Sequence, residues 1–98
     1  MTVVYSPRAI RDLEHIAAYY RTVADPKLAA AISERIEQVI DRVARRPETA
    51  PQVVERPGIR AVLVLRYPYK IFYRSRGVVI EILHIRHTAR RPWTPDAD

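Results

Sequence analysis

The sequence predicts an α+β fold in which two helices form a hairpin on one face of a small antiparallel sheet, in the order β-α-α-β-β-β. Three observations predict this fold. Apolar residues recur at helical spacing between Pro7 and Pro47, β-rich runs fill residues 59–87, and a proline-rich connector lies between the two regions. The 98 residues suffice for one domain and not for two, so we expect a single domain over residues 1–98, with residues 88–98 as a loosely ordered tail.

The chain is expected to open with a short strand at Val3–Tyr5, followed directly by a helix. Ser6 has the side chain of a helix N-cap, and Pro7 suits the first helical position, where its missing N–H would have no partner. The apolar stripe of this helix comprises Ile10, Leu13, Ile16, Ala17 and Tyr20. The helix is therefore expected to pack one face against the rest of the domain.

Asp25 and Pro26 repeat the same cap and start a second, longer helix that ends at Pro47. Its apolar stripe comprises Leu28, Ile32, Ile36, Val39, Ile40 and Val43. Because only a few residues separate the two helices, we expect an antiparallel helical hairpin. The charges on its surface nearly cancel, which indicates a scaffold with a solvated outer face.

An extended connector is expected next, because it contains Pro47, Pro51, Pro57 and Gly58. Three strands are expected after it, at Ile59–Leu65, Tyr69–Arg74 and Val78–His87. A tight turn or bulge at residues 66–68 and a short hairpin loop at residues 75–77 would join them. Two helices can cover only one face of such a sheet, so its other face is polar or bound to a partner.

The net charge of +6 lies entirely in the second half of the chain. Residues 1–55 contain eight basic and eight acidic residues, whereas residues 56–98 contain nine basic and three acidic residues. Lys27 and Lys70 are the only lysines, so 15 of the 17 basic residues are Arg, the side chain best suited to phosphate and carboxylate. This asymmetry predicts an anionic partner, either nucleic acid or an acidic protein segment.

Several classes of function are not expected. The absence of cysteine excludes disulfides and thiolate metal sites and favours the cytoplasm. We expect neither a signal peptide nor a membrane anchor, because no apolar segment of the required kind is present. Gly58 and Gly77 are the only glycines, so no phosphate-binding glycine loop exists. His84 and His87 lack an evident third ligand, so no metal or cofactor is expected.

Aromatic and cationic side chains are mixed in residues 67–74, Tyr-Pro-Tyr-Lys-Ile-Phe-Tyr-Arg. Aromatic faces can stack on bases while Lys70 and Arg74 hold phosphates. The alternative is that the tyrosines, Tyr73 among them, pack in the core and leave their hydroxyls at its edge. No acid lies near Lys70 or Arg74 in the sequence, which favours an external anion for both.

Residues 84–91, His-Ile-Arg-His-Thr-Ala-Arg-Arg, place two histidines and three arginines at the end of the last strand. Strand alternation predicts His84 and Arg86 on one face and His87 on the other. A histidine at the end of an apolar strand is also often a hydrogen-bonded structural residue, which is the alternative for His84. The arginines after the strand either solvate the tail or bind an acidic partner.

The same residues suggest a possible reaction. If His87 and Arg90 face a common groove, His87 can move a proton near neutral pH. Arg74, Arg86 and Arg90 would then hold a phosphate. This combination is the minimum for cleaving RNA through its own 2′-hydroxyl group.

At this point the chain resembles the RelE/ParE toxin superfamily of bacterial toxin–antitoxin modules. The resemblance rests on V-V-Y-S-P-R-A-I-R-D-L-E at the start, R-Y-P-Y-K-I-F-Y-R in the middle and V-V-I-E-I-L-H-I-R-H-T-A-R-R-P-W at the close, and it covers nearly the whole chain. It implies a compact β-α-α-β-β-β fold. It also implies an antitoxin with an acidic or amphipathic C-terminal segment that forms a hetero-oligomer with the toxin and neutralises it.

The superfamily contains ribosome-dependent messenger-RNA endonucleases, which are RelE-like, and DNA gyrase inhibitors, which are ParE-like. The close of this chain, His87–Trp93, is more similar to the ParE side. We therefore expect a gyrase-binding toxin that arrests growth without catalysis. The alternative is a metal-independent endoribonuclease, with His87, Arg74 and Arg90 as catalytic residues. A third hypothesis is a non-toxic nucleic-acid-binding module or a degenerate toxin.

The antitoxin is expected to add to a sheet edge or to lie across the helical hairpin. The residues expected to contact the target or the antitoxin are Arg66, Tyr67, Lys70, Tyr73, Arg74, His84, Arg86, Arg90, Arg91 and Trp93.

Overall fold

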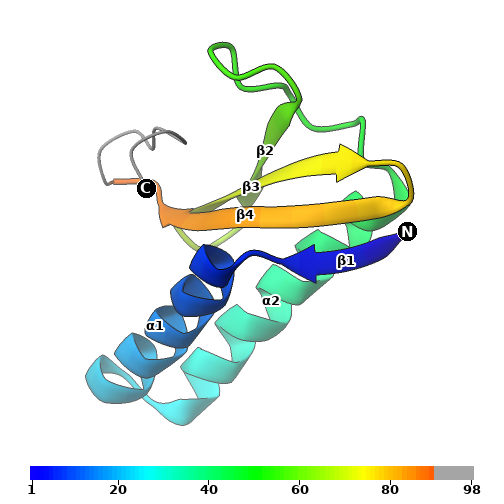
Figure 1. The fold of residues 1–98 in the computed structure, drawn as a ribbon. Helices are drawn as coiled ribbons and strands as arrows, with labels where there is room; N and C mark the ends of the chain where they lie inside the picture. Colours follow the sequence, from blue (N-terminus) through cyan, green and yellow to red (C-terminus); the bar gives the residue numbers. More distant parts are fainter. Residues whose placement is uncertain (90–98) are drawn as a thin grey trace.

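The computed structural model describes residues 1–89, and it confirms the predicted fold class and element order (Figure 1). The elements are β1 (Thr2–Tyr5), α1 (Pro7–Val23), α2 (Pro26–Arg45), β2 (Ile59–Val64), β3 (Tyr69–Arg76) and β4 (Val79–His87). Of the expected tail, only residues 88 and 89 are described, so the prediction for residues 90–98 lies outside the described part of the chain.

The four strands form one sheet in the order β1-β4-β3-β2. Neighbouring strands are antiparallel from β2 to β4, as expected, but β1 runs parallel to β4, so the sheet is mixed. The reason is the connection between β1 and β2. A hairpin of two helices returns the chain to the end of the sheet where β1 began, so β2 starts in the same direction as β1, and β4 follows two turns later.

Both helices begin as the sequence predicts. The Ser6 hydroxyl accepts a hydrogen bond from the Ala9 N–H at 3.0 Å, and the Asp25 carboxylate accepts one from the Leu28 N–H at 2.8 Å. Pro7 and Pro26 occupy the first turns. The buried residues of α2 are Ala29, Ile32, Ile36, Val39, Ile40 and Val43. In residues 1–89 neither helix is long and apolar enough to cross a membrane.

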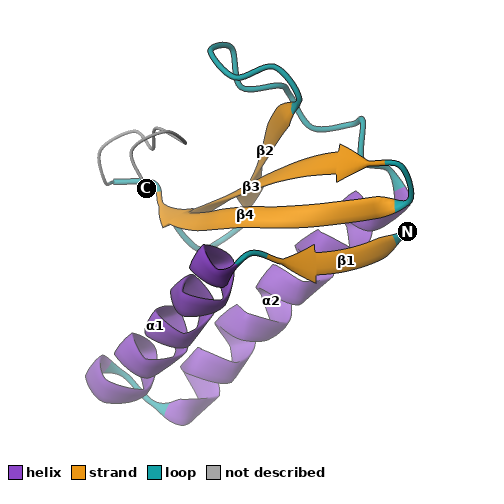
Figure 2. Ribbon diagram, viewed as in Figure 1, coloured by secondary structure: helices purple, strands orange, loops and turns teal. Residues whose placement is uncertain are grey.

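The helices cover one face of the sheet, as Figure 2 shows. Along β3, Tyr69, Ile71 and Tyr73 face the helices and are buried in the core. Lys70 and Arg74 alternate with them and lie on the opposite face, which carries no helix. We call this helix-free face of β2, β3 and β4 the outer face.

The β3–β4 hairpin is tighter than the sequence suggested. β3 continues through Arg76, so the expected loop at residues 75–77 is a turn at Gly77 and Val78. Gly77 has φ +57°, a left-handed conformation that glycine adopts without a steric penalty.

β4 contains a β-bulge that positions the rest of the strand. Phe72 pairs with His84 but the next residue, Tyr73, pairs with Ile82, so Leu83 has no partner on β3. β1 also ends here, with Tyr5 opposite Ile82, so beyond the bulge no strand pairs with this edge of β4. The start of α1 covers that edge.

Candidate functional site

The outer face is organised in three rows of side chains that run across the strands. From β2 to β4 these rows are Leu63–Lys70–Arg86, Ala61–Phe72–His84 and Ile59–Arg74–Glu81. Each row has a different chemical character, because the first is cationic, the second aromatic and the third contains an ion pair. The rows therefore show which of the predicted site residues act together.

Lys70 and Arg86 form the cationic row. They lie directly opposite each other on β3 and β4, an arrangement of like charges that destabilises a sheet by a few tenths of a kcal/mol or more. Within residues 1–89 no carboxylate forms an ion pair with Lys70. The Arg86 guanidinium carbon lies 5.9 Å from the centre of the Phe72 ring, a cation–π contact that holds it over the outer face. A bound anion would offset the repulsion between the two cations.

Arg74 is separate from this pair, contrary to the expectation that no acid lies near it. Its Nε atom is 2.7 Å from the Glu81 carboxylate, which the β3–β4 register places opposite. The sequence separation of seven residues concealed a direct cross-strand contact. Arg74 is thus neutralised inside the protein and adds little to the cationic surface.

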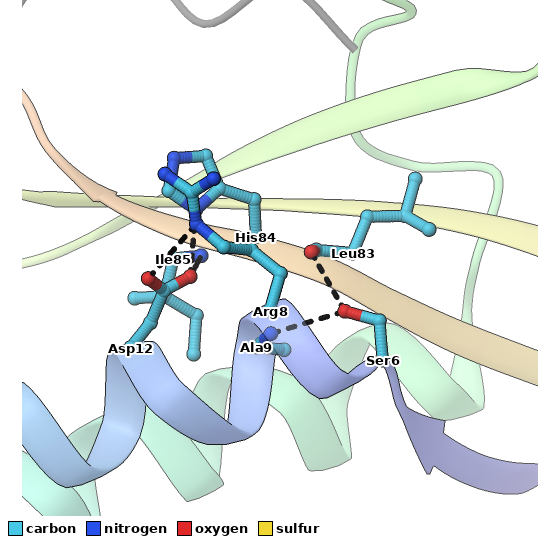
Figure 3. A network of polar contacts seen from close by, with 7 residues as sticks. All are labelled: Ser6, Arg8, Ala9, Asp12, Leu83, His84 and Ile85. Atoms are coloured by element: carbon cyan, nitrogen blue, oxygen red, sulfur yellow. Dashed lines mark hydrogen bonds and ion pairs between the residues drawn. The ribbon is translucent and has the colours of Figure 1, made fainter. Parts of the chain in front are cut away.

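His84 is a buried structural residue, and it does not lie at the surface as a contact residue would. It is 4% exposed, its ring stacks on Phe72 with centroids 6.0 Å apart, and its Nδ1 lies 2.6 Å from the Asp12 carboxylate (Figure 3). The same carboxylate oxygen accepts the Ile85 N–H at 2.9 Å. The hydrogen-bonded alternative for His84 is therefore confirmed.

The pKa of Asp12 reflects this environment. Burial by itself would raise the pKa of the carboxyl, but the hydrogen bonds from His84 and the Ile85 N–H, together with electrostatic interactions with His84 and Arg8, lower it below its ordinary value. Asp12 thus stays ionised and accepts hydrogen bonds from the open edge of β4. Sequence reasoning missed Asp12, because its partners lie 72 and 73 residues away and nothing local marks the contact.

A second contact joins α1 to the bulge. The Ser6 hydroxyl donates a hydrogen bond to the Leu83 carbonyl at 2.8 Å while it caps the helix (Figure 3). The contacts of Ser6 and Asp12 therefore hold β4 at the bulged residue and at the two residues that follow it. The bulge in turn keeps Arg86 on the outer face, because the residues after it resume the alternation of β3.

His87 lies on the opposite face from Arg86, as predicted, and its ring is in edge contact with Tyr69 at 5.5 Å. Its Nδ1 accepts a hydrogen bond from the Ala89 N–H at 3.1 Å, so in the neutral ring the proton is on Nε2. His87 is level with Tyr69, five residues along β3 from Arg74. At about 3.3 Å per residue that is a separation of roughly 16 Å. The predicted catalytic residues His87 and Arg74 are not brought together.

Tyr73 is also not at the surface. Its side chain is fully buried, and its hydroxyl donates a hydrogen bond to the Pro47 carbonyl at 2.7 Å. Burial raises the pKa of this hydroxyl, and the nearby Arg60 charge offsets part of the effect. The alternative that the tyrosines pack in the core is correct here, and Tyr73 holds the connector against the sheet.

The turn between β2 and β3 carries two more of the predicted contact residues. Tyr67 is partly buried and packs against the core, whereas Arg66 is exposed. Arg66 has φ +78°, a left-handed conformation that is unfavourable for a residue with a side chain. Arg90, Arg91 and Trp93, the remaining predicted contact residues, lie outside the described residues.

A groove of about 760 Å³ lies along β2 and the connector, and it reaches from α2 to the outer face. Lys70, Phe72 and Arg86 line it from the sheet, and Arg42 of α2 and Glu55 of the connector complete its charged lining. Three cations and one acid thus face this space. Sequence reasoning identified Lys70 and Arg86 but missed Arg42, which looked like part of the solvated helix surface.

No cluster of three or more His, Asp or Glu side chains in residues 1–89 could hold a metal ion. The described residues form a hairpin of two helices and a four-stranded sheet with a cationic row on its outer face, and the fold is that of the intact E. coli RelBE complex compared below. Residues 3–92 match the family model described as the ParE toxin of the type II toxin–antitoxin system parDE. The chain therefore belongs to the ParE toxin family and is the toxin of a toxin–antitoxin system.

Solved structures agree with this assignment. The chromosomal ParDE toxin–antitoxin system from P. aeruginosa has a chain with 25% identity and a TM-score of 0.79, and the match covers 89% of this chain and 95% of that one. The fold is also similar to that of the intact E. coli RelBE toxin–antitoxin complex, at 16% identity, a TM-score of 0.69 and coverage of 92% and 98%. The YoeB/ParE toxin from Agrobacterium tumefaciens shares the fold at 18% identity, a TM-score of 0.65 and coverage of 89% and 98%. A search of curated proteins gave no match.

Proposed function

We propose that this toxin inhibits DNA gyrase by binding, without catalysis, and that a cognate antitoxin neutralises it in the cytoplasm. Membership of the ParE family and the likeness to a ParDE system support this target. The observation that carries the proposal is the separation of His87 from Arg74. A ribonuclease of the kind considered from the sequence requires these groups at one phosphate, whereas a binding toxin requires only a charged surface.

The chemistry of each group supports the same conclusion. A general base needs an unprotonated nitrogen within hydrogen-bond reach of the hydroxyl that it activates. The Nδ1 of His87 already accepts the Ala89 N–H, and its Nε2 carries the proton. Glu81 neutralises Arg74, which would have to hold the phosphate. The cations best placed to bind a partner are instead Lys70 and Arg86, which lie on the face away from His87.

The proposal is tested with the purified toxin in parallel assays for gyrase supercoiling and for cleavage of ribosome-bound messenger RNA. We expect loss of supercoiling and intact RNA. The double variant Lys70→Ala/Arg86→Ala should weaken the inhibition at least several-fold. Arg11→Ala/Lys27→Ala removes the same charges from exposed helical positions and should leave it unchanged. RNA cleavage that His87→Gln abolishes, with supercoiling unaffected, would establish the endoribonuclease alternative instead.

A further inference from the structure

The connector between α2 and β2 contains a projecting loop of residues 53–58, which we call the tip loop. In Figure 1 it is the green loop that extends beyond β2, away from both helices. The Val53 N–H donates a hydrogen bond to the Ile59 carbonyl at 2.7 Å and closes the base of the loop. Just outside this base, the Arg60 guanidinium donates to the Ala50 carbonyl at 2.6 Å. The tip loop is therefore held to the body of the protein on both sides.

Two reverse turns fix the shape of the tip loop. In the first turn the Arg56 N–H donates to the Val53 carbonyl at 3.1 Å, and in the second the Ile59 N–H donates to the Arg56 carbonyl at 3.1 Å. The centre of the second turn is Pro57 followed by Gly58 with φ +86°, a pattern typical of a type II turn. Because the loop is already ordered, a partner that binds it loses little of the binding free energy to ordering.

The centre of the first turn carries Val54, followed by Glu55. The Val54 side chain is 95% exposed, the highest fraction of any large apolar residue within residues 1–89. Turn centres favour Gly, Pro, Asn, Asp or Ser, and a branched apolar side chain contributes nothing to such a turn. Single exposed apolar residues are common on protein surfaces. This one differs because an ordered loop holds its whole side chain away from the protein, where only a partner can cover it.

The tip loop borders the cationic surface already described. Val53 and Glu55, the neighbours of Val54 on either side, line the same groove as Lys70 and Arg86. A partner that binds the cationic row therefore lies next to the tip loop. The two features together form one surface, with positive charge on the sheet and an apolar side chain projecting beside it.

We propose that Val54 anchors this toxin to its target by entering an apolar pocket of gyrase, beside carboxylates that face Lys70 and Arg86. This inference rests on the proposed function and names the residue that makes the contact specific. A side chain at the apex of a convex loop is covered only by a concave surface. A folded protein offers such a pocket, whereas an extended peptide segment does not. Full burial of a valine side chain strengthens binding roughly ten- to a hundredfold.

The test is the affinity of the purified full chain for purified DNA gyrase, measured by surface plasmon resonance. Val54→Ser removes the apolar side chain and places a favourable turn residue, so the loop should keep its shape. We expect binding at least tenfold weaker than that of the natural chain. Val78→Ser is the matched control, because Val78 is a second valine in a turn and is 73% exposed, and it should change the affinity by less than about twofold.

Thermal unfolding checks that both variants are folded. Should Val54→Ser not fold, Val54→Asn, which also carries a turn-forming residue, takes its place. Sedimentation of the toxin alone, over a range of concentrations, measures whether copies of the chain associate with one another. We expect no association that depends on Val54.

Each of three results would overturn the inference while gyrase binding, and with it the proposed function, still stands. The first is equal gyrase affinity for Val54→Ser and the natural chain. The second is an equal loss of affinity in Val78→Ser, which would mean that exposed apolar surface matters and the tip loop does not. The third is self-association that Val54→Ser abolishes, which would make a second copy the occupant. If the natural toxin does not bind gyrase at all, the proposed function fails and the inference fails with it.

Discussion

Asp12→Ala should be one of the most destabilising single changes outside the hydrophobic core. The carboxylate accepts hydrogen bonds from the His84 ring at 2.6 Å and from the Ile85 N–H at 2.9 Å. Its side chain is 13% exposed, and the ring of His84 is 6% exposed. Alanine would leave both donors with little access to water, and the open edge of β4 would lose its contact with α1.

The magnitude follows from these two bonds. A hydrogen bond to a charged group contributes about 1.5–3 kcal/mol, and a buried donor left without an acceptor costs a similar amount. Allowing for partial access of water, we expect a loss of about 3 kcal/mol. For a domain of this size each kcal/mol corresponds to roughly 4–8 °C, so the melting temperature should fall by about 12 °C or more. Asp12→Asn keeps one acceptor oxygen and should lose about half as much.

Thermal and urea unfolding of the purified variants measure this loss. Arg8→Ala is the matched control, because its Nε is 3.4 Å from the same carboxylate and the side chain is 36% exposed, so it should change stability by less than about 0.5 kcal/mol. If Asp12→Ala unfolds within that same margin of the natural protein, the contact does not hold α1 to the sheet.

Four further outcomes are expected. Because the Asp12 pKa is lowered by folding, its contribution is complete above the unfolded value near 4 and is lost as the pH falls through the folded pKa; urea unfolding from about pH 6 to pH 2 should therefore show a steeper loss for the natural protein than for Asp12→Asn. Tyr73→Phe removes the hydroxyl bond to the connector and should cost about 1 kcal/mol in urea unfolding, and no loss would contradict the bond. Arg66→Gly relieves the left-handed backbone and should raise stability by about 1 kcal/mol in thermal unfolding, whereas a decrease would show that the conformation is not strained. Lys70→Ala removes the like charge opposite Arg86 and should leave stability equal or higher by a few tenths of a kcal/mol, and a clear loss would show that the two cations do not repel.

The local features of the fold could be read from the sequence, because local physics fixes them. Ser6 and Asp25 cap the two helices as expected. The core position of Tyr73 was only the alternative, because Tyr73 was also expected to contact the partner. The parallel pairing of β1 was missed, since strand direction depends on the path of the whole connection. The bulge at Leu83 was also missed, because it arises where β1 ends and α1 begins, far from β4 in the sequence.

The candidate site was predicted in part for the same reason. Lys70 and Arg86 were identified from charge alone, and the register then placed them opposite each other. The register also pairs Arg74 with Glu81 directly across the hairpin, and this ion pair neutralises its charge. His84 lies in the interior, where it is hydrogen-bonded to the carboxylate of Asp12, 72 residues away. Pairings of this kind depend on strand register and helix position, and composition contains no record of either.

Charge is distributed unevenly along the strands of the outer face, and this distribution limits what can bind there. The row with Arg74 and Glu81 is neutral. In the next row, the Phe72 ring stacks on that of His84, and both side chains are buried. Within residues 1–89 the cationic row of the outer face is the one with Lys70 and Arg86, which lie opposite each other. A ligand held by charge alone would need no more than these two cations. Leu63, which is 56% exposed and lies in the same row, adds apolar surface beside these cations, and this favours a protein partner over a ligand held by charge alone.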